Sequence, residues 1–82
     1  MPLYMDIHTV EGVTAAAAEG AHKADLQAQG PFDVRYLRYW VDEADGKIFC
    51  LVDAPSIEAA NAVHQQAHGL VAQQIFAVQE GA

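Results

Sequence analysis

The chain has 82 residues, which is enough for one domain, and we treat residues 1–82 as a single domain. Hydrophobic residues make up 52% of the sequence, a composition typical of folded rather than disordered proteins. The formal net charge of −7 disfavours nucleic acid and anionic membranes as partners, because both are negatively charged.

No segment has the pattern of a membrane span or of a targeting peptide. The longest apolar runs, FCLV and VTAAAA, are far shorter than the roughly 20 residues that cross a bilayer. The start of the chain, MPLYMD, lacks a basic region followed by an apolar one. We therefore expect a cytoplasmic protein.

The first half of the chain predicts a strand, a helix and a second strand. Residues 3–8 (LYMDIH) alternate between apolar and more polar side chains, which favours a strand, and VEGVT follows as a turn. Residues 14–29 are alanine-rich and predict a helix, with Thr14 as N-cap and Gly30-Pro31 as the stop. Residues 34–41 (VRYLRYWV) are β-branched and aromatic, which favours a strand.

The second half predicts a hairpin partner, a helix and a last strand. DEADG is expected to be a turn, and residues 47–53 (KIFCLVD) form the returning strand. Within this strand, Cys50 is expected to be a buried free thiol. Ser56 opens a helix that extends to about His68 and ends at Gly69. Residues 73–79 (QQIFAVQ) are the last strand.

This order of elements predicts an α+β fold of the ferredoxin-like, split βαβ type (βαββαβ). Both helices would cover one face of a four-stranded antiparallel sheet. Side-chain alternation places Met5 and Ile7 on the helix-facing side. The hairpin would add to that side Leu37, Val41, Ile48, Cys50 and Val52.

The opposite face of the sheet would be open and largely aromatic. Side chains expected there are Tyr4, Asp6, His8, Tyr36, Arg38, Trp40, Phe49, Leu51 and Asp53. So much apolar surface is unfavourable in water, so we expect a homodimer that buries it. A cleft for an apolar small molecule is the alternative.

His64 and His68 stand four residues apart in the second predicted helix and project from the same side, with Asn61 beside them. Neutral imidazole is a favoured ligand of nickel, copper and zinc. With Ala59, Val63, Ala67 and Leu70 packed inward, His64 would lie at the edge of the buried stripe and His68 toward solvent. The pair would then form a rim site, or simply be two polar residues on one face.

We expect the candidate ligands to form separate groups. We expect the first and third strands to run parallel in the centre of the sheet, which places His8 at the opposite end from His68. His8 would then form one site with Asp6 and Asp53. The acidic residues of the hairpin turn would join His64 and His68 in a second; they are Asp42, Glu43 and Asp45. A third, weaker site would be His22 with Glu19 and Asp25, unless His22 is an exposed helix residue.

Neither a GxSxG motif nor a phosphate-binding glycine loop nor paired cysteines occur in the sequence, so we do not expect an enzyme. One alternative is a cofactor-independent oxygenase or isomerase, as related small α+β folds include such enzymes and a His–Asp pair can act as general base. A structural or partner-binding module that uses the aromatic face is another.

The stretch VRYLRYWVDEADGKIFCLVDAPSIEAANAVHQQAHGL resembles the central signature of a family of small ferredoxin-like proteins described as nickel-binding or nickel-responsive. RYWVDE, FCLV, AP and the paired histidines carry this resemblance, which extends from the first predicted strand to the last. It implies a cytoplasmic homodimer that holds Ni²⁺ for sequestration. Imidazole and carboxylate ligands suit Ni²⁺ and also other divalent transition metals. The predicted ligands are His8, His64, His68, His22, Asp6 and Asp53.

Overall fold

The computed structural model describes residues 2–81 and contains all the elements that the sequence predicts. In chain order they are β1 (Leu3–Thr9), α1 (Ala15–Ala28), a 3₁₀ turn (Gly30–Phe32), β2 (Arg35–Asp42), β3 (Lys47–Asp53), α2 (Ile57–Ala67) and β4 (Gln74–Val78). The ends of these helices and strands agree with the predicted ends to within one residue. In residues 2–81, no helix has the length and apolar character that crossing a membrane requires.

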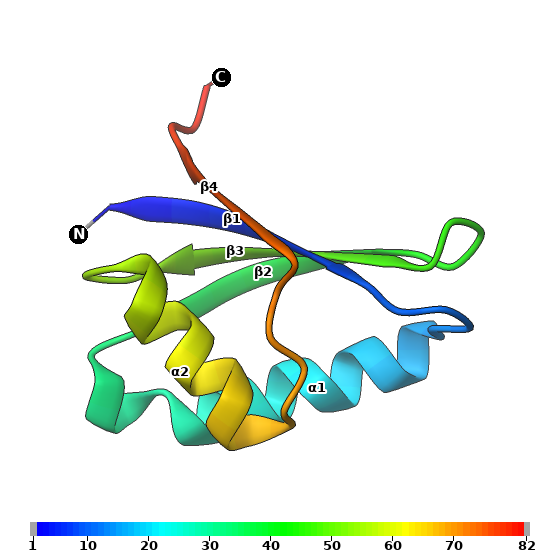
Figure 1. Cartoon of the computed structure of the whole chain (residues 1–82), viewed down its shortest axis with the longest axis horizontal. Coiled ribbons are helices and arrows are strands. Elements are labelled where there is room, and N and C mark those ends of the chain that lie inside the picture. Colours follow the sequence, from blue (N-terminus) through cyan, green and yellow to red (C-terminus); the bar gives the residue numbers. More distant parts are fainter. Residues whose placement is uncertain (1, 82) are drawn as a thin grey trace.

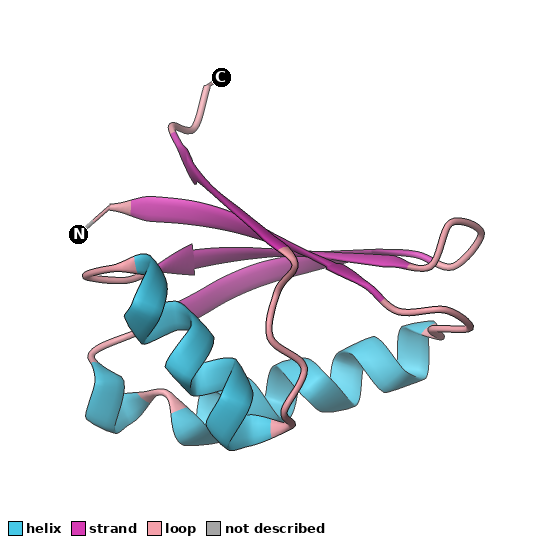
Figure 2. Cartoon of the chain, viewed as in Figure 1, coloured by secondary structure: helices cyan, strands magenta, loops and turns pink. Residues whose placement is uncertain are grey.

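The strands form one antiparallel sheet in the order β2-β3-β1-β4. Both helices pack on the same side of this sheet (Figure 1), and the two layers are separated clearly in Figure 2. The predicted α+β class is therefore confirmed, in an arrangement consistent with a ferredoxin-like fold.

The central strands β1 and β3 are antiparallel, so the expectation that they run parallel is wrong. Leu3 pairs with Asp53 at one end of this ladder and Thr9 pairs with Lys47 at the other. The reason is the connection: the α1 crossover makes β2 parallel to β1, and the tight turn after β2 sends β3 back between them.

Local signals explain where the helices begin. Thr14 Oγ1 accepts a hydrogen bond from the Ala17 N–H at 3.1 Å, and Ser56 Oγ accepts one from the Ala59 N–H at 3.1 Å. Each hydroxyl thus satisfies one of the N–H groups that lack a partner within the first helical turn. Thr14 is therefore confirmed as an N-cap, and the helix that we expected to open at Ser56 has Ser56 as its N-cap.

Gly46 fixes the hairpin against the loop that follows β1. Its φ is +66°, and a Cβ atom at this position would lie 2.9 Å from the Val10 carbonyl oxygen. Its own carbonyl accepts a hydrogen bond from the Val10 N–H at 2.8 Å. Glycine is needed here both for the left-handed backbone and for the close approach.

The space between sheet and helices combines a small apolar core with buried polar groups. The buried hydrophobic residues are Val13, Ala18, Val34, Tyr36, Ile48, Cys50, Val52, Ala54, Ala60 and Val63. Asp6, His8, Asp25 and His64 are each no more than 3% exposed. Such residues are rarely buried unless they are paired or have a specific role.

Several predicted side-chain orientations are wrong. In β1, Asp6 and His8 face the helices, which places Met5 and Ile7 on the open face by alternation. The polar residues are inside because they meet α2, a contact that the strand pattern alone does not contain.

A β-bulge between Tyr36 and Arg38 reverses the predicted orientation at the start of β2. Tyr36 is buried and Leu37 is 45% exposed, the opposite of what we expected. After the bulge the alternation is as predicted, because Val41 packs against the core and Trp40 is 49% exposed. The predicted inward positions in β3 (Ile48, Cys50 and Val52) are confirmed.

Candidate metal centre

Strands β1 and β3 place three potential metal ligands side by side beneath α2. Asp6 and His8 are two residues apart in β1, so their side chains point to the same face. Cys50 lies directly opposite Asp6 in the β1–β3 ladder, and opposed residues share a face. All three side chains are buried between sheet and helices.

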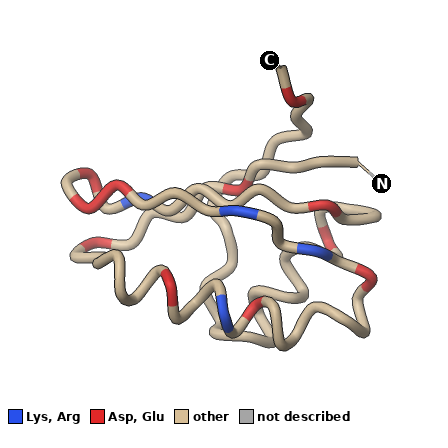
Figure 3. The backbone as a smooth tube through the Cα atoms, turned by 180° about the vertical axis from the view of Figure 1, so that it is seen from behind, with Lys and Arg blue, Asp and Glu red and all other residues tan. Residues whose placement is uncertain are grey.

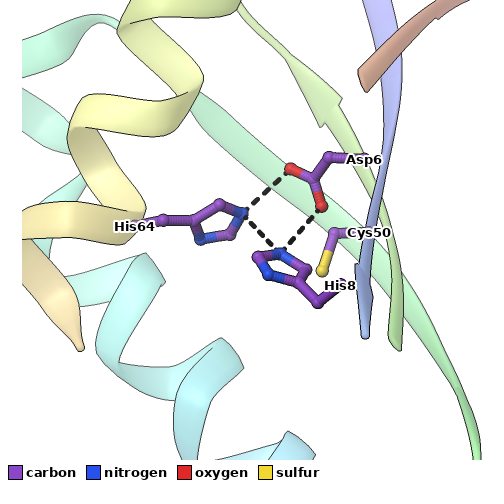
Figure 4. Close-up of side chains that lie close together, drawn as sticks. All are labelled: Asp6, His8, Cys50 and His64. Carbon is purple, nitrogen blue, oxygen red and sulfur yellow. Dashed lines mark hydrogen bonds and ion pairs between the residues drawn. The ribbon is translucent and has the colours of Figure 1, made fainter. Parts of the chain in front are cut away.

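His64 of α2 completes this group, which we call the inner cluster: Asp6, His8, Cys50 and His64 (Figure 4). The Nε2 atoms of His8 and His64 are 3.1 Å apart. Asp6 spans both rings, with Oδ2 2.9 Å from His64 Nε2 and Oδ1 3.1 Å from His8 Nε2. One donor atom from each of the four residues lies within 4.8 Å of the others.

A second group, the outer cluster, consists of Asp25 from α1 with His64 and His68. Asp25 Oδ1 lies 2.9 Å from His64 Nδ1 and 3.1 Å from His68 Nε2. Asp25 is 2% exposed, whereas the His68 side chain is 15% exposed. The two clusters therefore share His64 and use opposite sides of its ring.

Tyr36 closes the inner cluster on the side of β2. Its hydroxyl lies 2.8 Å from His64 Nε2, 3.0 Å from Asp6 Oδ2 and 3.1 Å from the Ala60 carbonyl oxygen. Burial and the neighbouring Asp6 carboxylate raise the pKa of Tyr36 far above its ordinary value. The phenol is therefore protonated, and it holds the carboxylate and the imidazole in place.

The charges in the cluster stabilise one another. Burial lowers the pKa of His64, but the hydrogen bonds and charges of Asp25 and Asp6 outweigh this and raise it to about 9. Burial raises the pKa of Asp6, but its contacts with His64 and His8 bring it down to about 2. Without a metal, His64 is thus an imidazolium between two carboxylates, which is how a buried charge is tolerated.

A small pocket lies beside this centre. Its lining includes His8, Cys50 and His64 together with His22, His68 and Leu70. Its inner volume is about 10 Å³, close to what one water molecule needs. The pocket therefore has room for an ion or a water but not for an organic substrate.

The structure combines ligands that we expected to be separate. His8 lies near the end of β1, and because β1 is antiparallel to β3, this end is near the start of β3 and beneath the end of α2. His8, His64 and Asp6 therefore meet at one centre, and the expected division into two distant sites is wrong. His64 is 1% exposed, so it is an interior residue and not part of a rim; Leu70, expected inside, is 45% exposed because α2 ends before it.

Asp53 and the turn carboxylates are not in either cluster. Asp53 lies at the other end of β3, where its Oδ2 accepts a hydrogen bond from Arg35 Nη2 at 2.7 Å. Glu43 accepts a hydrogen bond from the Ala15 N–H, and Asp42 accepts one from the Asp45 N–H. The acidic residues of the β2–β3 turn lie at the tip of the hairpin (Figure 3). The predicted pairing of His8 with Asp6 is present, but Asp53 does not join it, and the turn residues do not join His64 and His68.

His22 also lies outside both clusters. Its ring packs on Tyr39 with 4.8 Å between the ring centroids. The carboxylates that we expected beside it have other partners, because Glu19 pairs with Lys23 and Asp25 is directed toward His64. His22 lines the pocket, but the third predicted site is not formed.

Sequence reasoning missed Asp25 as a partner of His64, and it treated Cys50 only as a core residue. One signal for Asp25 was available, since it stands seven residues after Ala18 in α1 and so lies on the same helix face. Ala18 is 1% exposed, so this face of α1 is directed toward the interior. For Cys50 the predicted burial is confirmed, and its position opposite Asp6 depends on strand pairing.

The inner cluster fits a bound divalent metal ion. Two nitrogens that each bind one ion at about 2.0–2.1 Å would be about 2.9–3.4 Å apart, and the two Nε2 atoms meet this condition. Asp6 Oδ1 is buried and receives no aligned hydrogen bond within the described part of the chain. A buried acceptor without a hydrogen bond is a reason to consider an ion at that position.

Comparison with known proteins gives two matches. Residues 4–78 match a protein family described as "Nickel responsive protein SCO4226-like". The chain is similar to the crystal structure of SCO4226 from Streptomyces coelicolor A3(2), with 37% sequence identity and a TM-score of 0.89. This likeness covers 98% of this chain and 99% of that chain. A comparison with curated proteins finds no match.

Proposed function

Because this chain belongs to the SCO4226-like family of nickel responsive proteins, we propose that it binds Ni²⁺ through Asp6, His8 and His64. The observation that carries the proposal is the meeting of both Nε2 atoms and the Asp6 carboxylate at one buried point. The family is described by a response to a metal and not by a reaction.

The charge of the cluster supports a divalent ion. Asp6 and Asp25 contribute two negative charges around His64, and a proton on the imidazole offsets one of them. An ion of charge 2+ that replaced this proton would offset both. Burying a charge is tolerated when it is compensated in this way.

The donor atoms by themselves do not select nickel. Imidazole and carboxylate also suit zinc and copper, and the intrinsic order of affinities places Cu²⁺ above Ni²⁺. The family description supports nickel among these metals. Cys50 would be a fourth donor on losing its proton, although burial and Asp6 raise the pKa of the free thiol well above its ordinary value.

The size of the pocket supports holding an ion rather than catalysis. An inner volume of about 10 Å³ admits a water molecule that could complete the metal's ligands. The His–Asp pair that an oxygenase or isomerase would use as general base lies beside this small pocket, which has no room for an organic substrate. We therefore favour nickel sequestration or buffering, in the cytoplasm, over the enzyme alternative.

We also propose that the protein is a homodimer formed through the open face of the sheet. Large apolar side chains are exposed there, with Leu37 at 45%, Trp40 at 49% and Phe76 at 50%. Leu37 and Trp40 border a groove that also contains Leu3 and Met5. Covering this surface with a second copy would remove it from water.

Titration of metal-free protein with Ni²⁺ tests the proposed metal function. We expect stoichiometric heat from the wild type and its loss in His8→Ala and in His64→Ala, because each variant removes one of the two nitrogens. His22→Ala is the matched control, since it removes a pocket histidine that is outside both clusters. A wild type without stoichiometric heat, or equal loss in His22→Ala, would contradict the proposal.

A further inference from the structure

The inner and outer clusters use the same imidazole, and this limits how they can bind metal. His64 directs Nε2 toward Asp6 and His8 and directs Nδ1 toward Asp25. A neutral imidazole has one N–H group and one nitrogen lone pair. Only one of the two clusters can therefore use His64 as an ordinary metal ligand.

Asp25 determines which nitrogen of His64 carries the lone pair and can bind a metal. An ionised carboxylate only accepts hydrogen bonds, so the 2.9 Å contact requires a proton on His64 Nδ1. The lone pair of the neutral ring is then on Nε2, which faces the inner cluster. A carboxylate behind a ligating histidine also makes the imidazole a stronger ligand.

A backbone N–H group fixes the tautomer of His68 in a similar way. The Leu70 N–H donates to His68 Nδ1 at 3.1 Å, so this nitrogen carries the lone pair. The proton of the ring must then be on Nε2, which lies 3.1 Å from Asp25 Oδ1. In this arrangement His68 Nε2 is a hydrogen-bond donor to Asp25 and has no lone pair for a metal.

We propose that Asp25 and His68 are positioning residues of one metal centre and not ligands of a second ion. The Leu70 N–H donates to His68, and His68 donates to Asp25. His64 donates to the same Asp25 oxygen. These hydrogen bonds fix the tautomer of His64, so that the lone pair of Nε2 is directed toward the inner cluster. The inference rests on the proposed function, and it assigns a single ion to the inner and outer clusters together.

Two substitutions of His68 separate positioning from ligation. In His68→Gln the side-chain amide can still donate to Asp25 but offers no imidazole nitrogen, whereas His68→Ala removes the donor. In equilibrium dialysis with Ni²⁺, we expect both variants to bind as many ions per chain as the wild type. Affinity should fall by about 10- to 100-fold in His68→Ala, as for other residues that orient metal ligands, and be largely restored in His68→Gln.

Nitrogen-15 NMR of the histidine rings gives a readout that does not depend on bound nickel. In metal-free protein above neutral pH, we expect His68 to be protonated on Nε2 and not on Nδ1. In protein loaded with Zn²⁺, a diamagnetic probe, His64 should bind through Nε2 and keep its proton on Nδ1.

The outcomes distinguish this inference from the proposed function. A wild type that binds no Ni²⁺ would contradict the proposed function, whatever the NMR result. Loss of an ion in His68→Gln, or a proton on His68 Nδ1, would overturn the inference while leaving nickel binding intact. Circular dichroism of both variants would establish that they remain folded.

Discussion

At the scale of single residues, the centre depends on a buried imidazolium that two carboxylates stabilise. His64 is 1% exposed and contacts Asp6 on one side and Asp25 on the other. Removing either carboxylate would leave a buried charge without full compensation, which is costly. The same arrangement makes the metal-free protein sensitive to pH, in a direction that can be derived from the pKa of His64.

We expect the metal-free protein to lose stability as the pH rises from 6.5 to about 9, the ordinary and folded-state pKa values of His64. Because folding raises this pKa, the stabilisation is fully present below 6.5 and is lost as the pH rises through the folded value. The free energy of unfolding should fall by up to about 1.4 kcal/mol per pH unit in this range, the slope for one proton. Urea unfolding at a series of pH values measures it.

His64→Gln is the control for this effect, since glutamine has no proton to lose in the same range. Its unfolding free energy should be lower than that of the wild type at pH 6.5 and should change little up to about 9. A wild type with constant stability over this interval would show that His64 is not stabilised as an imidazolium.

Nickel binding should depend on pH in the opposite sense. Imidazole must be neutral to bind a metal, and the pKa of His64 in the metal-free protein is about 9, so Ni²⁺ uptake should weaken progressively as the pH falls below about 9. Because the raised pKa leaves His64 protonated near neutrality, binding should also release protons. Calorimetry in buffers of different ionisation enthalpy counts them, and uptake that is independent of pH would rule out histidine as the main ligand.

At the scale of helices and strands, the sequence predicts boundaries well because the signals for them are local. Thr14 and Ser56 cap helices with their own hydroxyls, and Gly46 and Gly69 have the positive φ angles of turns and helix ends. These signals involve residues only a few positions apart. The order of the six helices and strands then leaves few topologies to consider.

It is harder to predict from the sequence which face of a strand packs against the core. In β1 the apolar set Leu3, Met5 and Ile7 could face either the helices or the open side. The choice is made by the contacts of Asp6 and His8 with His64, which lies more than 50 positions further along the chain. In β2 a single bulge reverses the pattern, and alternation does not reveal it in advance.

The residue types of the candidate metal centre can be predicted from the sequence, but the way in which they come together cannot. His64 and His68 were recognised by helical spacing, and Asp6 with His8 by strand alternation. That these two pairs meet depends on β1 and β3 being antiparallel, which we predicted wrongly. Asp25 comes from a third element, α1, and no spacing to the histidines of α2 indicates it.

The close approach at Gly46 gives a test of how the hairpin is held. Gly46→Ala should lower the free energy of unfolding by about 1–3 kcal/mol, since φ is +66° and the added Cβ would lie 2.9 Å from Val10 O. Gly20→Ala, in the exposed part of α1 with open space around it, should instead raise it by about 0.5–1 kcal/mol. Urea unfolding compares them, and equal effects would contradict this account of Gly46.

At the scale of the whole molecule, the apolar core is small and polar groups are buried beside it. A metal ion or a second copy that binds the folded chain would therefore add noticeably to its stability. The core consists largely of alanine and valine, which bury little apolar surface each. Anything that binds the folded chain and not the unfolded one adds to its stability. A metal in the inner cluster and a second copy on the open face would act in this way on opposite sides of the sheet.

Added Ni²⁺ should therefore raise the midpoint of thermal unfolding. At a free concentration 100 times the dissociation constant, the expected gain is about 2.7 kcal/mol. His8→Ala should show no such gain, because it lacks one of the two Nε2 atoms. A comparable rise in His8→Ala would place the stabilising ion outside the inner cluster.

The proposed dimer is tested by a charge in the open face. Tyr36, which we expected there, is inside, so Trp40 is the largest exposed side chain of that face, with Phe49 and Leu51 half-buried beside it in β3. Trp40→Glu should convert a dimeric wild type into monomers, because burying an unpaired carboxylate in an apolar interface costs several kcal/mol. Leu26→Glu is the matched control, since Leu26 is 43% exposed but belongs to α1. Sedimentation velocity distinguishes the outcomes: a Trp40→Glu variant that remains dimeric would exclude the open face as the interface and leave it as a surface for a different ligand.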